Sequence, residues 1–301
     1  MARRVVRYSF QMPIRDLLLA LCVPLIWGLG FTFAKAGLGE IPPLLLMGLR
    51  FSIAALVLVW FVKPPTGHYL EIFWIALVSA TIQYGLTFSG LAMMDASLAV
   101  IVVQLEIPFG VLLGVILLRE RPGLQRIIGL VIAFAGIVLI AGQPSLKEQL
   151  FPMLLTASGA FMWAVGQIMV KRLDGAVDGF ALIAWVGVFA GPQMIASSFL
   201  IEDGQLAALA NATWVGWSTV LYLGLVMTAL GYGIWYHVLS RNPVSQVMPV
   251  LLLLPLFSIA GSMLFLGERP GAIVFAGGAV VLTGVALITV VRRERVAATA
   301  G

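Results

Sequence analysis

Charged residues are scarce in this sequence. They make up 10% of the 301 residues, whereas hydrophobic residues make up 61%. Soluble domains carry roughly one quarter charged residues, so this chain has too little polar surface to enclose a water-soluble core. The few basic residues stand at the ends of apolar runs and form no stripe with aromatic residues. A nucleic-acid surface is therefore excluded despite the net charge of +5.

Cysteine is nearly absent as well, and the common catalytic motifs are missing. The single Cys22 lies within the first apolar run, which excludes a disulfide framework and a paired-cysteine metal site. No HExxH, GxSxG or GxxxxGK[ST] motif occurs, so we expect no metal, no cofactor and no ATP-driven step in this chain. An intramembrane enzyme is a distant alternative, because it would need a nucleophile with a base or a carboxylate pair. Only one acidic residue, Glu106, is central.

Long apolar runs fill the sequence instead. Each is about 20 residues long, which is enough to cross roughly 30 Å of hydrocarbon as a helix. The runs do not alternate in polarity, as the strands of a membrane barrel would. Lipid cannot satisfy bare backbone, so the runs must be helical. We predict an all-α integral membrane protein with ten transmembrane helices, at residues 15–36, 43–62, 70–92, 97–118, 124–142, 150–171, 179–201, 214–238, 244–266 and 271–291.

The distribution of basic residues predicts the orientation of the chain. Of the 18 lysines and arginines, 14 fall on the side of both termini, 3 fall on the other side, and Arg50 lies within a span. Basic loops stay on the cytoplasmic side. We therefore expect a bacterial inner (plasma) membrane protein with a cytoplasmic leader at residues 1–14 and a cytoplasmic tail at residues 292–301.

Two copies of one pattern occur along the chain. W-x-x-G-x-x-x-x-K begins at Trp27 and again at Trp163, and Glu-Arg-Pro-Gly begins at Glu120 and again at Glu268. These matches predict two five-helix repeats, residues 15–142 and 150–291. Because five is odd, the second copy enters the membrane from the opposite side, which favours two inverted repeats around a central cavity and alternating access. The alternative is that the duplication merely built a larger bundle.

Taken together, these features resemble the EamA-like branch of the drug/metabolite transporter superfamily over the whole chain. The resemblance rests on the ten spans, the two repeats, Trp27-Gly28 with Lys35, Arg50-Phe51, and Glu-Arg-Pro in both matched loops. It implies a ten-helix fold with a central cavity and export of amino acids, aromatic ones included, or related small metabolites. We expect a small-molecule substrate and the lipid bilayer as partners, with the chain acting as a monomer or weak homodimer. Export of drugs or other metabolites is the alternative.

Glu106 is the clearest candidate for a role in transport. It lies about midway along the fourth span, where an ionisable side chain costs about 2.5–3.5 kcal/mol on insertion scales. It could accept a substrate amino group, or take and release a proton to couple transport to a gradient. The alternative is a structural bond to a neighbouring helix.

Two prolines occupy nearly equivalent positions in the repeats, Pro108 and Pro255. Each lacks the amide that would bond the carbonyl four residues back, so we expect helix breaks with the carbonyls of Gln104 and Leu251 free. Such breaks can place backbone dipoles at a binding site, although proline kinks also occur in spans with no ligand nearby.

Aromatic and amide residues at mid-span complete the predicted site. Facing inward, they would form an apolar cavity with a few orienting polar groups, whereas the alternative for each is packing between helices. His237, near the end of the eighth span, is a second coupling candidate because histidine titrates near neutral pH, and the alternative for it is an interfacial position. The residues predicted to line the cavity are Trp163, Gln167, Gln83, Tyr84, Glu106 and Tyr232.

Overall fold

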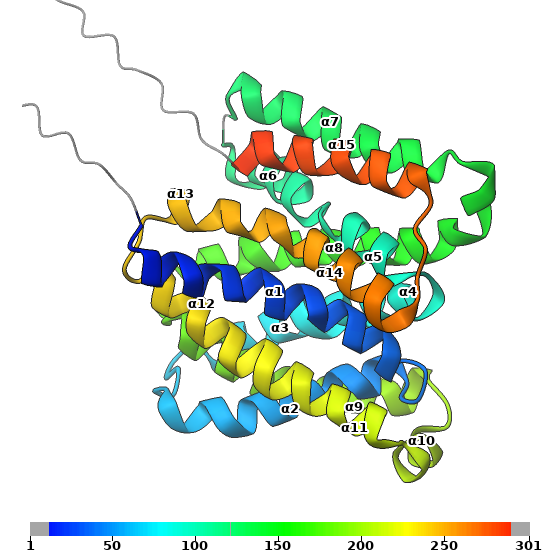
Figure 1. The fold of residues 1–301 in the computed structure, drawn as a ribbon. Helices are drawn as coiled ribbons and strands as arrows, with labels where there is room; N and C mark the ends of the chain where they lie inside the picture. The colour runs from blue at the N-terminus through cyan, green and yellow to red at the C-terminus, as the bar shows by residue number, and fades with distance from the viewer. Residues whose placement is uncertain (1–11, 121, 290–301) are drawn as a thin grey trace, which may run out of the picture.

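The protein is seen here as a computed structural model that describes residues 12–120 and 122–289. Regular structure in this range is helical, with no strand. Ten helical segments are long and apolar enough to cross a membrane, and they lie side by side in one bundle (Figure 1). The predicted all-α architecture with ten spans is confirmed. The predicted tail lies outside the described residues, as does most of the leader.

The first five spans contain seven α-helices, and the third span also contains a π-helical segment. They are α1 (Ile14–Gly37), α2 (Pro43–Leu58) with the 3-10 turn η1 (Val59–Phe61), α3 (Tyr69–Ala76) with the π-helical η2 (Leu77–Ile82) and α4 (Gln83–Met93), α5 (Ala96–Val103) with α6 (Glu106–Leu118), and α7 (Leu124–Ala141).

The second five spans repeat this order after the 3-10 helix η3 (Pro144–Gln149). They are α8 (Leu150–Arg172), α9 (Gly179–Ile201), α11 (Trp214–Leu221) with the π-helical η4 (Tyr222–Leu230) and α12 (Gly231–Leu239), α13 (Val244–Val247) with the 3-10 helix η5 (Met248–Leu253), α14 (Leu254–Gly261) and the π-helical η6 (Ser262–Leu266), and α15 (Ala272–Thr289). The short α10 (Gln205–Asn211) lies in the connection between the seventh and eighth spans.

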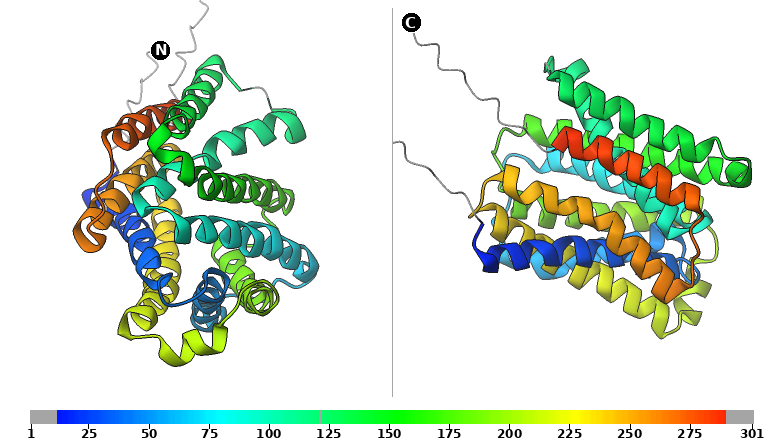
Figure 2. Two further views of the ribbon diagram at one scale, coloured as in Figure 1. Left: turned by 90° about the vertical axis from the view of Figure 1, so that its right-hand side faces the viewer. Right: turned by 45° about the horizontal axis from the view of Figure 1, so that its top comes forward.

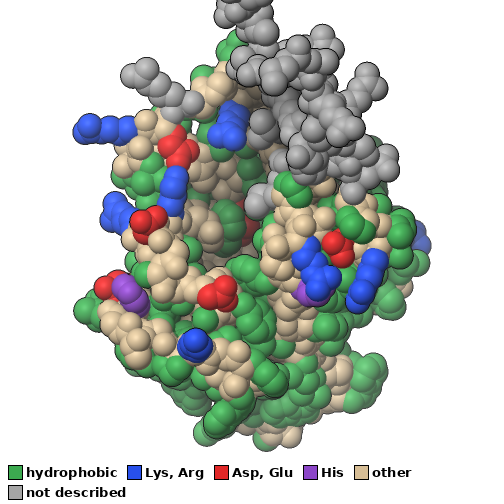
Figure 3. Space-filling model, turned by 90° about the vertical axis from the view of Figure 1, so that its left-hand side faces the viewer, with side chains coloured by type: hydrophobic (Ala, Val, Ile, Leu, Met, Phe, Trp, Pro, Cys, Tyr) green, Lys and Arg blue, Asp and Glu red, His purple; other side chains and the backbone are tan. Residues whose placement is uncertain are grey.

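Both described ends of the chain, Met12 and Thr289, lie at the same end of the bundle (Figure 1). We call this end the terminal face and the other end the opposite face. Lysine and arginine side chains are spread over the terminal face (Figure 3). The described basic residues there are Arg15, Lys63, Arg119, Arg126, Lys171, Arg172 and Arg241, whereas the opposite face carries Lys35, Lys147 and Arg269.

Contacts between helices recur with the two repeats exchanged. The contact of α1 with α14 recurs as α8 with α6, and the contact of α1 with α12 recurs as α8 with α4. Two further pairs, α2 with α9 and α7 with α15, join helices that are each other's equivalent. The bundle therefore has the packing expected for two copies related by a twofold axis, and Figure 2 shows it from two further sides.

Glycines bring α7 and α15 into close contact. A Cβ atom at Gly129 would lie 2.6 Å from the carbonyl oxygen of Gly284, and one at Gly136 would lie 2.8 Å from the amide nitrogen of Val281. Small residues on one face let transmembrane helices approach this closely. The pair sits along one side of the bundle in both views of Figure 2.

Candidate functional site

The fourth span is broken near its middle. α5 ends at Val103 and α6 begins at Glu106, with a turn between them. Pro108 cannot donate to the carbonyl of Gln104, but the Ile107 amide donates to it at 3.3 Å. The expectation of a free Gln104 carbonyl is therefore wrong, because the chain tightens by one residue and satisfies it.

The ninth span is interrupted at the equivalent place. The 3-10 helix η5 leads into α14, and the Leu254 amide donates to the carbonyl of Leu251 just before Pro255. The expectation of a free Leu251 carbonyl is wrong for the same reason. The two prolines interrupt the helices without exposing these two backbone acceptors, so their part in binding stays a prediction.

Glu106 occupies the first position of α6, at the break in the fourth span. It is enclosed by protein, yet part of its side chain remains accessible. Its carboxylate makes no hydrogen bond or ion pair with any residue of the described range, and its oxygens are not among the buried unpartnered atoms. A Cβ atom at Gly110, one turn further along the same helix, would meet nothing within 4 Å. Figure 3 shows the terminal face hollowed near its centre.

Arg50 of α2 is the buried cation of this region. Its side chain is 1% exposed. Its Nε donates to the Thr228 hydroxyl at 2.9 Å, and its guanidinium carbon lies 5.2 Å from the ring centre of Phe51 and 4.9 Å from that of Tyr84. Aromatic faces attract a cation in this way. No carboxylate in the described ranges pairs with Arg50. Its Nη2 atom has no hydrogen-bond partner there and is not fully buried.

Tyr232 connects the two charges. The Tyr232 hydroxyl lies close enough to Arg50, Glu106, Tyr84 and Tyr236 to interact electrostatically with each of them. Its ring centre is 4.9 Å from that of Trp27. Three predicted residues, Glu106, Tyr84 and Tyr232, are therefore brought together. Arg50, which the sequence prediction left out of the site, joins them, and the available signal was that it is the one basic residue deep within a predicted span.

The two repeated tryptophans differ in their hydrogen bonds. The Trp27 indole nitrogen donates to the Met227 carbonyl at 3.0 Å. The Trp163 indole nitrogen has no partner among the described residues and is not buried. Trp163 packs against a cluster that includes Leu113 of α6, the helix that begins with Glu106. The indole N–H of Trp163, a predicted lining residue, is thus available to donate a hydrogen bond.

The two glutamines have different surroundings. Gln83 is 3% exposed and donates to the Thr87 hydroxyl at 3.3 Å. Its backbone carbonyl lies against Gly159, so it packs where α4 meets α8 rather than facing open space. Gln167 is exposed, one turn beyond Trp163, and has no hydrogen-bond partner in the described part of the chain. The role of both in binding stays a prediction.

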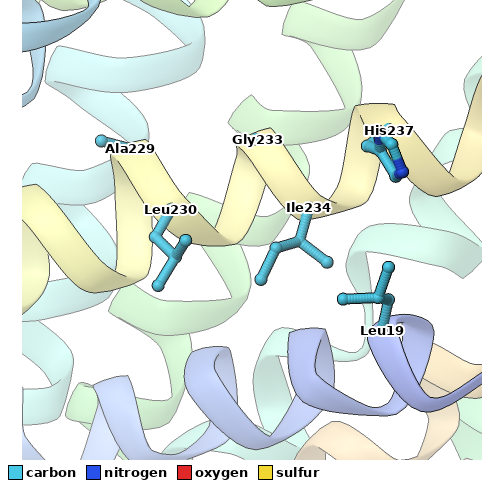
Figure 4. Close-up of a pocket in the computed structure, with 6 residues that line it drawn as sticks. All are labelled: Leu19, Ala229, Leu230, Gly233, Ile234 and His237. Atoms are coloured by element: carbon cyan, nitrogen blue, oxygen red, sulfur yellow. The ribbon is translucent and has the colours of Figure 1, made fainter. Parts of the chain in front are cut away.

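His237 lines an apolar groove on the side of the bundle. Figure 4 shows this groove between α1 and the eighth span. His237 follows Tyr232 by five positions, which is about 140° around an α-helix, and its side chain is exposed. It is therefore not placed with Glu106, and its coupling role stays a prediction. The groove is lined by Leu19, Ala229, Leu230, Gly233, Ile234 and His237.

Among residues 12–120 and 122–289, no group of three or more histidine, cysteine or acidic residues could hold a metal ion. Comparison with known proteins then gives the class of molecule. The model of the EamA-like transporter family matches residues 15–142 and again residues 150–290. The chain belongs to the EamA-like transporter family. It is accordingly a multi-pass membrane transporter and not an enzyme.

Relatives of this EamA-like chain include bacterial exporters. It is 33% identical to the "Probable amino-acid metabolite efflux pump" of Escherichia coli strain K12, over 90% of this chain and 93% of that one. It is 32% identical to the protein of the same name in Salmonella typhimurium, with the same coverage. A solved crystal structure covers 92% of this chain and 97% of its own with a TM-score of 0.62 at 19% identity, which supports the fold alone.

Proposed function

We propose that this transporter exports zwitterionic amino acids and closely related metabolites. One observation carries the proposal: Arg50 and Glu106, of opposite charge, lie around Tyr232 and neither pairs with a carboxylate or cation of the described residues. A buried charge without a partner is costly, so a chain that keeps two such charges has a use for them. Arg50 binds the substrate carboxylate and Glu106 accepts the ammonium group. The names of the Escherichia coli and Salmonella relatives support this substrate class.

Aromatic side chains around the two charges favour apolar and aromatic amino acids. Tyr84 and Tyr232 lie beside the charged groups, and Trp163 offers a free indole N–H next to α6. Flat rings provide apolar contact area and a polar tip, as small-molecule sites require. Gln167, which is exposed, belongs to the outer part of this proposed site, and Gln83 supports the site from the contact of α4 with α8.

Transport proceeds by alternating access between the two repeats, residues 15–142 and 150–291. We place the terminal face in the cytoplasm of a bacterial inner membrane because basic residues are concentrated there. Glu106 takes a proton when no substrate ammonium is bound, and His237 is the second coupling candidate. Labelling Lys63→Cys and Lys147→Cys in a Cys22→Ser background with an impermeant thiol reagent tests the orientation. Labelling of Lys63→Cys from outside intact cells would contradict it.

Three related compounds test the site in proteoliposomes: phenylalanine, phenethylamine, which lacks the carboxylate, and 3-phenylpropionate, which lacks the amine. We expect Arg50→Gln to lower phenylalanine transport about 100-fold with little effect on phenethylamine, because truncating a buried charge contact costs 2–5 kcal/mol. Glu106→Gln should spare 3-phenylpropionate instead. Arg50→Lys should retain part of the activity, and Lys63→Gln, on the terminal face, is the control.

Complete inactivity of the wild type over a broad panel of amino acids would overturn the substrate class. Equal loss of all three compounds in both variants would overturn the assignment of the two charges. Transport of many amines that does not depend on Arg50 would favour export of drugs or other metabolites by the same fold.

A further inference from the structure

The repeated Glu-Arg-Pro-Gly motif has the same backbone in both halves but different side-chain partners. Arg119 (φ 56°) and Gly267 (φ 69°), the residues just before the two glutamates, both end their helices in the left-handed region. Glu120 and Glu268 therefore start from equivalent positions. The matching backbone bonds run from the amides of Glu120 and Glu268 to the carbonyls of Gly114 and Ser262, at 3.1 and 3.2 Å.

On the opposite face, Glu268 caps a helix of the other repeat. Its carboxylate accepts from the amides of Ala96 at 2.7 Å and Ser97 at 3.0 Å, the first two residues of α5. A carboxylate at a helix N-terminus satisfies free amides and is favoured by the helix dipole. All eight side chains of α5 are buried, so this cap helps to close the opposite face.

Lys35 strengthens the same closure. Its ammonium group donates to the carbonyls of Leu91 at 3.0 Å and Ala92 at 2.9 Å, at the end of α4. Asp95 and Glu268 lie within electrostatic range of it. The first, third and fourth spans therefore meet the loop of Glu268 at one point.

On the terminal face, the equivalent glutamate is engaged elsewhere. Glu120 accepts from Lys171, the repeat equivalent of Lys35, at 2.5 Å, and the two side chains are 45% and 59% exposed. Glu120 makes no bond to the start of α13, although α13 is the equivalent of α5. The next segment, η5, has no buried residue. The terminal face therefore lacks the closure seen at the opposite face.

We propose that Glu120 and Glu268 act as alternating caps that set the direction in which the site opens. In the present conformation Glu268 caps α5 and closes the opposite face. In the other conformation Glu120 leaves Lys171, caps α13 and closes the terminal face, while Glu268 releases α5 and pairs with Lys35. Lys171 then turns to the carbonyls at the end of α12, as Lys35 does at the end of α4. The inference rests on the proposed alternating access, but not on the identity of the substrate.

Each lysine has a defined part in this exchange. A released carboxylate near the bilayer needs a counter-charge, which Lys171 supplies to Glu120 here. Breaking a helix cap changes the balance between two conformations by about tenfold. Neutralising Glu120 and neutralising Glu268 should therefore shift the equilibrium between the two conformations in opposite directions.

Distance measurements on the full chain in proteoliposomes test the exchange. Spin labels at Gly39 and Gly271, both exposed, report on the opposite face in a Cys22→Ser background. Labels at the exposed Ala176 and Gly123 report on the terminal face. Glu268→Gln should lengthen the first distance and shorten the second in about tenfold more molecules than in the wild type. Glu120→Gln should keep the present distances and deplete the alternative ones.

Two further variants keep the test decisive. Lys171→Gln removes a contact of Lys171 from both conformations, so it should shift the distances less than either glutamate variant does. If Glu268→Gln fails to fold, Glu268→Asp shortens its reach and should shift the distances in the same direction. Glu202→Gln is the matched control, because Glu202 caps α2 through the amides of Leu44 and Leu45 and has no equivalent in the other repeat. It should leave both distance distributions in place.

Identical shifts in Glu120→Gln and Glu268→Gln, or none in either, would overturn the proposal. The readout is a distance and needs no substrate. A wild type that moves no amino acid yet shows the opposed shifts would defeat only the proposed function. Amino-acid transport without opposed shifts would defeat only the alternating caps.

Discussion

The first half of the fourth span, α5, and its equivalent in the ninth span, α13 with η5, are both mainly apolar but have different surroundings. Every side chain of α5 is buried, whereas none of η5 is. α1 packs on α5, but α8 makes at most a marginal contact with α13 and η5. Both segments are apolar, so their composition does not explain the contrast. In the proposed exchange of caps, this contrast belongs to a conformation that is closed at the opposite face.

The two spans differ in charge at one position. Glu106 begins α6, and Leu254, 148 residues later, begins α14 at the equivalent place. The inverted fold is therefore nearly symmetric in its packing, but its proposed site is not. A transporter built from two copies can keep one substrate group in one copy while both copies move.

Making the two spans alike at this position should have the largest effect. Glu106→Leu gives the fourth span the residue of the ninth, and we expect amino-acid transport to fall on the order of 100-fold because the ammonium partner is gone. The folded fraction should hold, since Glu106 bonds no described residue. Initial rates in proteoliposomes measure the loss. Normal rates would show that the asymmetry at this position has no function.

The two tryptophans sharpen the comparison. Trp163→Phe should raise the substrate concentration at half-maximal rate about tenfold with little change in the thermal midpoint. Trp27→Phe should lower the thermal midpoint, because it removes a hydrogen bond worth about 1 kcal/mol to the Met227 carbonyl. Thermal unfolding in detergent and transport kinetics separate the two effects. If Trp27→Phe changed the transport kinetics and Trp163→Phe lowered the thermal midpoint, the substrate would lie beside Trp27 instead.

Asp95 should give the smallest effect. Burial and the neighbouring Glu268 raise the pKa of Asp95 in this conformation, against the opposing influence of Lys35. A raised pKa means that the closed opposite face binds the proton more tightly, so its population should grow as the pH falls toward the ordinary carboxylate range and shrink as the pH rises. Asp95→Asn should remove this pH dependence and favour closure about twofold. The Gly39–Gly271 distance at pH 5 and pH 8 measures both effects, and a pH dependence that persists in the variant would contradict the assignment.

Much of the fold could be predicted from the sequence, because the length and apolarity of a run decide whether it spans a bilayer. The odd number of spans per repeat then predicts the inverted packing. The mid-span positions of Glu106, Tyr84 and Tyr232 predict a shared site, because polar groups there are costly unless they are used. These inferences need only local composition and spacing.

Most of what the sequence could not predict involves partners that lie far away along the chain. Arg50 was left out because its contacts with Tyr84 and Thr228 join three different spans. The contact of Gln83 with α8 could not be predicted, because spacing along a helix does not say which neighbour a face meets. The free carbonyl expected at Gln104 did not allow for a turn tightening by one residue.

The glycine contact between α7 and α15 has a mechanical consequence. α7 and α15 occupy equivalent positions in the two repeats. When the two repeats exchange conformations, the contact between α7 and α15 is therefore unchanged. The contact between α7 and α15 can therefore stay the same in every step of the transport cycle while the other spans move around it. Enlarging Gly284 should reduce the yield of assembled protein equally for all states, whereas changes at the moving spans alter only the preference between states.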